Sequence, residues 1–284
     1  MMGYVISVVN HKGGVGKTAF AMLLAAGFDY LQQKNPELLP EELREKPILA
    51  IDNDPQGNMS EGMGFLASEM LADITDAYEE IVKTGKITKN HIPIMNTYKN
   101  SNIKLIPATI RLEDMSSILR SRIEEKHVLK MIINAIRDDY SIIVVDTPPY
   151  MGVFSQNAIV ASDYVVIPIL LHMHSIIGIP HMLNFIRNAK YTLNEELKPL
   201  GIVINAYDKR YRLQNALYES VNIRLAEFIY DHYVPTNSKL AENISMHKYP
   251  FSSMTTDALE AMLDVVKETI ARMSVEYTLP DSVI

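Results

Sequence analysis

The chain has 284 residues, of which 48% are hydrophobic and 21% charged, and its formal net charge is −7; this balance is typical of a globular protein with a sizeable core and disfavours a constitutive nucleic-acid binder. The sequence has no cysteine, which excludes disulfides, thiolate zinc sites, cysteine nucleophiles and cysteine-ligated iron–sulfur clusters. No apolar run is long enough for a membrane span, and the N-terminus lacks an export signal, so we expect a cytoplasmic protein.

Short apolar strands alternate with helical stretches along the chain. Because the strands are apolar on both faces, they predict a three-layer α/β fold: a doubly wound, mostly parallel sheet with helices on both faces. No stretch is typical of an interdomain linker, so we expect a single domain over 1–284. In chain order, the expected elements are a strand at 4–9, a helix at 19–31, a polar surface loop at about 32–47, strands within 48–58 and 102–108, a helical stretch at 124–140, strands within 141–152 and 163–169, a helix around 179–190, a strand at 200–207, and helices around 212–230 and 256–273.

Three polar motifs follow apolar strands, after Val9, Ile51 and Val145. In doubly wound sheets, ligands bind at the carboxyl ends of the strands. The position of these motifs therefore predicts a ligand site at that edge of the sheet.

The first motif, "HKGGVGKT", is close to a phosphate-binding loop. The strict pattern G-x-x-x-x-G-K-[ST] would place a glycine where this chain has His11. Gly13, Gly14 and Gly16 let the backbone wrap around phosphate oxygens, Lys17 can reach the β- and γ-phosphates, and the Thr18 hydroxyl can ligate Mg²⁺. The alternative is a glycine-rich turn between a strand and a helix, which the Gly-Lys-Thr spacing disfavours.

The other two motifs supply carboxylates. Asp146 closes an apolar strand, where a Walker-B aspartate would hold the magnesium shell. Asp52 and Asp54 follow another strand, and one of them could orient or deprotonate the attacking water. The alternatives are a turn cap for Asp146 and an Asp-Pro turn at Asp54.

These motifs resemble those of the ParA/MinD family of deviant Walker A ATPases. "KGGVGKT", "DNDPQGN" and "VVDTPPYMGVFSQNAI" are similar to the family's phosphate loop, switch segment and Walker-B region. "LIPATIRLEDM", "GIVINAYDKR" and "VPTNSKLAENISMHKYPF" are similar to later family segments, so the resemblance covers nearly the whole chain. The small ParA partition ATPases without an N-terminal helix-turn-helix domain are the most similar subgroup.

The resemblance implies ATP and Mg²⁺ as ligands and assigns roles to individual residues. Lys12 would be the signature lysine that crosses a nucleotide-sandwich homodimer to the partner's phosphates, and Asp54 would activate water. Thr18, Asp146 and Asp52 would form the Mg²⁺ site. His11 would be a packing residue of the loop, and a bulky Tyr150 stands where many members have serine. The nucleotide would contact Lys12, Gly13, Gly14, Val15, Gly16, Lys17, Thr18 and Ala19, with the adenine at Asn205, Pro235 and Asn237.

The family's function is a slow ATPase switch that segregates or positions a plasmid, chromosome or other cargo. It implies non-specific DNA binding in the ATP state, with nucleoid association, and stimulation by a ParB-like partner protein. The DNA-binding candidates are Lys209, Arg210, Arg212 and Lys239. The terminal "SVEYTLPDSVI" lacks lysine and arginine, which disfavours a MinD-like membrane tether. Positioning on a protein array without DNA, or a metabolic P-loop synthetase, stays an alternative.

Overall fold

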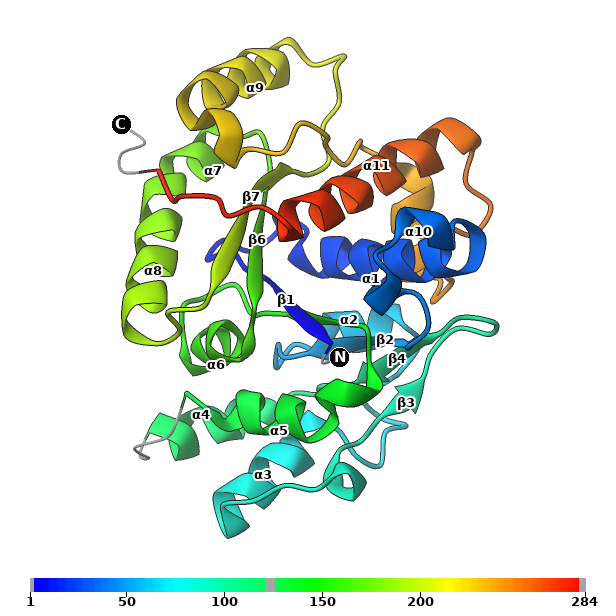
Figure 1. Cartoon of the computed structure of the whole chain (residues 1–284), viewed down its shortest axis with the longest axis vertical. Helices are drawn as coiled ribbons and strands as arrows, with labels where there is room; N and C mark the ends of the chain where they lie inside the picture. The colour runs from blue at the N-terminus through cyan, green and yellow to red at the C-terminus, as the bar shows by residue number, and fades with distance from the viewer. Residues whose placement is uncertain (1–2, 121–125, 281–284) are drawn as a thin grey trace.

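A seven-stranded sheet runs through the middle of the protein in the order β3-β4-β2-β5-β1-β6-β7 (Figure 1). The computed structural model describes residues 3–120 and 126–280. Only β3 runs antiparallel to its neighbour among the described strands, which confirms the predicted mostly parallel sheet. The strands are β1 (Tyr4–Val8), β2 (Ile48–Asp52), β3 (Met95–Asn96), β4 (Ile103–Ile106), β5 (Ile142–Asp146), β6 (Tyr164–Ile169) and β7 (Lys198–Ile204).

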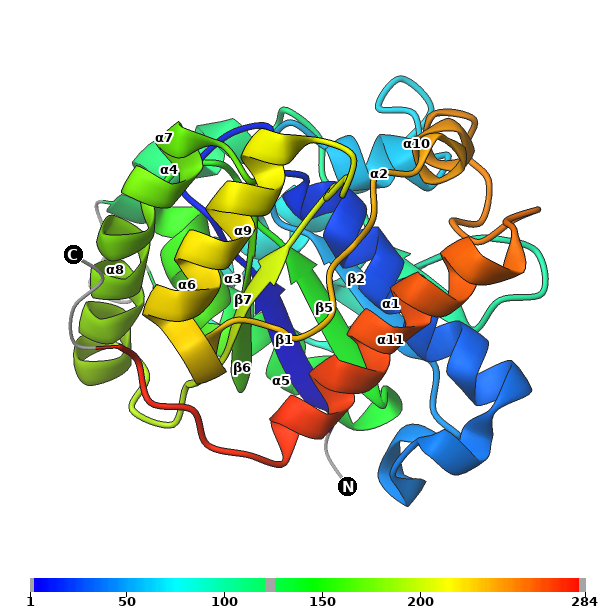
Figure 2. The same ribbon diagram turned by 90° about the horizontal axis from the view of Figure 1, so that it is seen from above.

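Helices cover both faces of this sheet (Figures 1 and 2). One layer contains α1 and α11, and the opposite layer contains α3, α4, α5 and α6, with α8 beside α6. The architecture is therefore the predicted three-layer α/β fold. The helices are α1 (Lys17–Lys34), α2 (Asn58–Gly62), α3 (Ile74–Thr84), α4 (Leu112–Arg120), α5 (Val128–Ile136), α6 (Val153–Ala161), α7 (Met173–Ile177), α8 (Ile179–Thr192), α9 (Arg212–Leu225), α10 (Ser238–Ser245) and α11 (Thr256–Met273).

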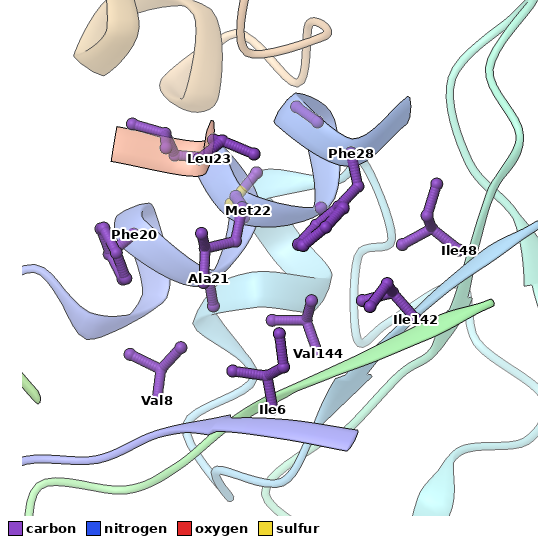
Figure 3. Packing of buried hydrophobic residues seen from close by; sticks show 14 of the residues in the cluster. Ile6, Val8, Phe20, Ala21, Met22, Leu23, Phe28, Ile48, Ile142 and Val144 are labelled. Carbon is purple, nitrogen blue, oxygen red and sulfur yellow. The ribbon is translucent and has the colours of Figure 1, made fainter. Parts of the chain in front are cut away.

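The central strands are hydrophobic at every position because both of their faces are covered. In β5, Ile142 and Val144 face the layer of α1, whereas Ile143 and Val145 face the layer of α3 to α6. Figure 3 shows Phe20 and the neighbouring apolar residues of α1 packed over this first face. The packing fixes the amino end of α1 above the carboxyl ends of β1 and β5.

The segment expected as a polar surface loop at about 32–47 contains some regular structure. Helix α1 continues to Lys34, and two 3₁₀ turns follow at Pro36–Leu38 and Glu41–Leu43. Leu39 and Leu43 are each 2% exposed and join the core beneath α1. Two leucines spaced four residues apart among charged residues were the signal for this packing.

Two other boundaries differ from the predictions. The helix predicted around 212–230 ends at Leu225, because Ala226 has a φ of 37° and breaks the helical backbone. The helical stretch predicted at 124–140 forms α5 and a 3₁₀ turn at Arg137–Asp139, while 124 and 125 lie outside the described residues. The final helix, α11, has the predicted bounds.

Within residues 3–120 and 126–280, no helix is both long and apolar enough to cross a membrane.

Candidate functional site: a phosphate loop at the edge of the sheet

The three sequence motifs meet where β1, β2 and β5 end. The register pairs Asp52 of β2 with Asp146 of β5, and Val8 of β1 with the same Asp146. The side chains that follow these strands therefore surround one cleft of about 500 Å³. Its walls are Gly13, Gly14, Gly16, Lys17, Thr18, Ala19, Asp54, Asn58, Glu61, Gly62, Pro149, Ile244, Ser245 and His247.

The glycine loop leaves the start of α1 open toward this cleft. Gly14 and Gly16 have φ angles of 73° and 79°, in the left-handed region that glycine adopts without a steric penalty. Among the described residues, no side chain caps α1 at Gly16. The first N–H groups of α1 and its positive dipole end therefore remain available to an anion, as in phosphate-binding loops.

The two lysines of the loop occupy different places. Lys17 is buried, and its Nζ donates a hydrogen bond to the Lys12 carbonyl at 3.2 Å. Burial lowers the pKa of Lys17, against the opposing effects of Asp146 and Asp54. Lys12 is more exposed. Lys17 thus lines the cleft, whereas Lys12 is half-buried and is not among the cleft walls.

Thr18 and Asp146 meet at the base of the cleft. The Thr18 hydroxyl donates to Asp146 Oδ2 at 2.6 Å, and the Thr147 amide donates to Oδ1 at 3.0 Å. Burial, and next the charge of Asp52, raise the pKa of Asp146. In the part of the chain that is described, no three His, Asp or Glu side chains form a metal site by themselves. A hard cation here would take oxygen from Thr18 and Asp146 and complete its shell with other oxygens.

Asp52 is already engaged by the protein. Its Oδ2 accepts from the Ser60 amide at 2.8 Å and from the Ser60 hydroxyl at 2.7 Å, and its Oδ1 accepts from the Asp54 amide at 3.2 Å. Burial raises the pKa of Asp52 despite these donors. Asp52 therefore holds the 53–60 segment in place. That Asp52 also contributes to the Mg²⁺ site stays a prediction.

Asp54 lines the cleft and is 4% exposed. One of its oxygens, Oδ1, accepts from the Gln56 amide at 3.0 Å, which fits the Asp-Pro turn of the sequence. Burial raises the pKa of Asp54. A carboxylate so placed can accept a proton from a water molecule in the cleft.

None of the three residues predicted to contact adenine is among the cleft walls that the described residues form. Asn205 Nδ2 donates to the Val15 carbonyl at 2.9 Å and thereby supports the phosphate loop. Asn237 caps α10 by accepting from the Leu240 amide at 2.9 Å. Pro235 pairs with Tyr207 in an isolated bridge. Their contact with a base stays a prediction.

The predicted basic cluster lies on the loop between β7 and α9. Lys209 lies over the Tyr233 ring at 5.3 Å, and Arg210 forms an ion pair with Asp208 at 2.6 Å. Arg212 is exposed and pairs with no described carboxylate. Lys239 lies further along, on α10, where Glu242 neutralises it at 2.9 Å. The structure thus brings three of the four cations together, and two of the four carry carboxylate partners.

The sequence predictions missed Asn10 and the outer wall of the cleft. Asn10 Nδ2 donates to the Pro168 carbonyl at 2.8 Å, and its Oδ1 accepts from the Lys12 amide at 3.0 Å. A polar residue just after an apolar strand, as with Asp52, was the signal for it. At the outer wall, His247 contacts the Glu61 carbonyl at 2.6 Å; no local pattern indicates that contact between distant segments.

Comparisons with known proteins find relatives over most of the chain. A family model described as an AAA domain matches residues 3–199. The sporulation initiation inhibitor protein Soj of Bacillus subtilis is 30% identical over 95% of this chain and 99% of its own. The chromosome-partitioning ATPase Soj of Treponema pallidum is 30% identical, with 95% and 98% covered.

Two solved structures share the fold. A McdA variant from Cyanothece in complex with ATP has a TM-score of 0.77 at 17% identity, covering 95% of this chain and 97% of its own. The cobyrinic acid a,c-diamide synthase of Mycobacterium smegmatis with an ATP analogue and magnesium has a TM-score of 0.71 at 22% identity, covering 87% and 91%. With the phosphate loop, its two lysines and the strand-end aspartates in place, the chain belongs to the ParA/MinD family of deviant Walker A ATPases.

Proposed function

We propose that this chain is an Mg²⁺-dependent ATPase switch of the ParA type, which dimerises around ATP and then binds DNA to segregate or position a cargo. The observation that carries the proposal is the pair of lysines on one loop. Lys17 is buried and lines the cleft, whereas Lys12 is half-buried and is not among the cleft walls. A single bound nucleotide needs the first lysine, and the second is available to a nucleotide held by another copy.

ATP would bind with its phosphates on the glycine loop and the amino end of α1. Mg²⁺ would be held by Thr18 and Asp146, whose hard oxygens suit this ion, and when bound it supplies charge neutralisation to the phosphate oxygens. A buried carboxyl group with a raised pKa is one that a nearby cation would favour as carboxylate. The ATP analogue and magnesium of the synthase structure support the same ligands here.

Asp54 would accept the proton of the attacking water. It lines the cleft at the phosphate loop, and burial raises its pKa toward neutrality, which favours a general base. Lys12 of the second copy would neutralise charge that develops on the transferred phosphoryl group. Because that lysine comes from another chain, hydrolysis would depend on dimerisation.

Exposed apolar side chains at the same edge of the sheet as the cleft would form a rim that contacts the second copy. Ile110, Tyr150, Met173 and Ile177 are between 37% and 64% exposed, and each follows the carboxyl end of a strand. Exposed apolar side chains gathered at one edge are typical of an interaction surface. A two-fold dimer through this rim would place each Lys12 next to the other chain's nucleotide.

The β7–α9 loop would supply the DNA contacts of the ATP-bound dimer. Lys209, Arg210 and Arg212 are close in sequence and face solvent at the start of α9, so they can meet successive phosphates. The dimer would carry two copies of this small patch, and DNA would bind to that local positive charge although the net charge of the chain is −7. A ParB-like partner would stimulate hydrolysis and so release the dimer from DNA. The chain would therefore stay on the nucleoid only while its bound ATP is intact.

Reversing the charge of Arg210 and Arg212 tests the DNA role. The double variant Arg210→Glu, Arg212→Glu should lose ATP-dependent retention of double-stranded DNA in a gel-shift assay at moderate salt, because each lost phosphate contact lowers affinity and reduces the salt slope by about one. A matched variant, Lys86→Glu with Lys99→Glu, changes net charge equally at exposed positions on other loops and should bind like the wild type. Unchanged binding by the Arg210, Arg212 variant would move the DNA surface elsewhere.

The same assay separates the proposal from an array-positioning ATPase that does not act on DNA. The carboxylate partners of Arg210 and Lys239 reduce the positive charge of the patch and favour that second candidate. Wild-type chain that never shifts DNA, with ATP or with ADP, would support positioning on a protein array.

A further inference from the structure

The backbone of Lys12 is held on both sides. Its amide donates to Asn10 Oδ1 at 3.0 Å, and its carbonyl accepts from Lys17 Nζ at 3.2 Å. Asn10 is itself fixed to β6 through the Pro168 carbonyl. The direction in which the Lys12 side chain leaves the loop is therefore set by the sheet and by the nucleotide-site lysine.

The Lys12 side chain lies against Gly178, at the junction of α7 and α8. A Cβ atom at position 178 would stand 2.9 Å from Lys12 Cε and 3.1 Å from His11 Cε1. Gly178 has φ −80° and ψ −13°, a conformation open to any residue. A glycine is therefore needed here because it leaves space for Lys12 and His11, and not because of the backbone conformation.

The Lys12 side chain lies in a seat that Gly178 forms on one side and His11 on the other. It lines a small cavity with Gly178 and Ile179, and its Nδ1 is buried with no hydrogen-bond partner among residues 3–120 and 126–280. The imidazole therefore packs at this position without a hydrogen bond from Nδ1. It fills the position where the strict loop has glycine and limits the movement of the adjoining Lys12.

The seat is continuous with the apolar rim. Helix α7 ends at Ile177, next to Gly178, and the Gly178 amide donates to the Ser175 carbonyl at 3.1 Å. Met173 and Ile177 of α7 are 54% and 63% exposed. A chain that packs on α7 therefore contacts the same short segment that supports Lys12.

We infer that Gly178 and His11 are positioning residues that hold Lys12 in the orientation needed to reach a second chain's phosphates, and that contact with α7 on dimerisation sets this orientation. The inference rests on the proposed role of Lys12 in trans. It assigns the α7–α8 junction a part in catalysis without contact with the nucleotide.

Gly178→Ala tests this directly. Since a displacement of about 1 Å can cost about 10²-fold in rate, we expect kcat for ATP hydrolysis, measured with Mg²⁺ and double-stranded plasmid DNA, to fall about 10- to 100-fold while KM for ATP stays unchanged. Glu195→Ala, at an exposed residue between α8 and β7 and outside the proposed dimer contact, is the control and should keep wild-type kcat. A wild-type kcat for Gly178→Ala would overturn the inference.

A double-variant comparison separates this inference from the proposed function. In the Lys12→Ala background, Gly178→Ala should cause no further loss of kcat, because its effect acts through Lys12; a multiplied loss would contradict the inference. If Gly178→Ala does not fold, His11→Ala opens the same seat and should lower kcat without raising KM, and an unchanged kcat would again count against it. If Lys12→Ala itself retains full turnover, the proposed function fails first.

Discussion

Lys12→Ala is expected to reduce ATP turnover by at least about 10³-fold, the range known for a cationic group supplied in trans to phosphoryl transfer. Its Nζ would otherwise neutralise charge on the partner's transferred phosphoryl group. Nucleotide affinity should persist, because Lys17, Thr18 and the open amino end of α1 remain in place. Turnover is measured by phosphate release and affinity by titration with ATP.

Lys46→Ala serves as the control for Lys12→Ala. Lys46 Nζ donates to the Asp138 carbonyl on the opposite edge of the sheet, before β2 begins. That variant should therefore turn over ATP like the wild type. Full turnover by Lys12→Ala would remove the trans-acting lysine from the account and leave only a nucleotide-binding loop.

Asp54→Ala is expected to stop hydrolysis and to accumulate an ATP-bound dimer. Loss of a general base lowers the rate of hydrolysis about 10²- to 10⁴-fold. The bound ATP therefore stays intact during the measurement, and the dimer does not disassemble. Size-exclusion chromatography with light scattering should show twice the monomer mass in ATP and Mg²⁺, and monomer in ADP. A monomer in ATP would contradict the switch.

Asp54→Asn is the sharper form of the same variant. The asparagine oxygen can still accept from the Gln56 amide, so the 53–60 turn is kept while the proton acceptor is lost. Both variants should behave alike. If only Asp54→Ala loses activity, Asp54 supports the turn and another group activates the water.

The sheet and the phosphate site could be predicted because their signals are local. Buried strands between helices are continuous apolar runs, and polar residues such as Asp52 and Asp146 mark where they end. A parallel sheet then brings these ends to one edge, and the register of β2 and β5 places the two carboxyl groups side by side. Gly16, Lys17 and Thr18 mark the start of α1 equally clearly.

Other features depend on distant contacts and left no such signal. Strand β3 has two residues and exists because β4 offers an open edge. Helix α9 ends at Leu225 in a sequence that favours continuation, because the following segment turns back to pair with β7 through Ile229. The support of the phosphate loop by Asn205 joins residues 190 positions apart. Tertiary packing decides each of these points.

The central claim is that two chains complete each catalytic site, and a complementation assay tests it most directly. Lys12→Ala and Asp54→Ala chains, each inactive alone, are mixed in equal amounts before ATP and Mg²⁺ are added. In a mixed dimer, the nucleotide held by the Lys12→Ala chain has that chain's own Asp54 and the partner's Lys12. Random pairing makes half of the dimers mixed, each with one intact site, so turnover should recover to about a quarter of wild type. A mixture as inactive as its components would contradict the account, because a lysine acting within its own chain leaves every mixed site incomplete.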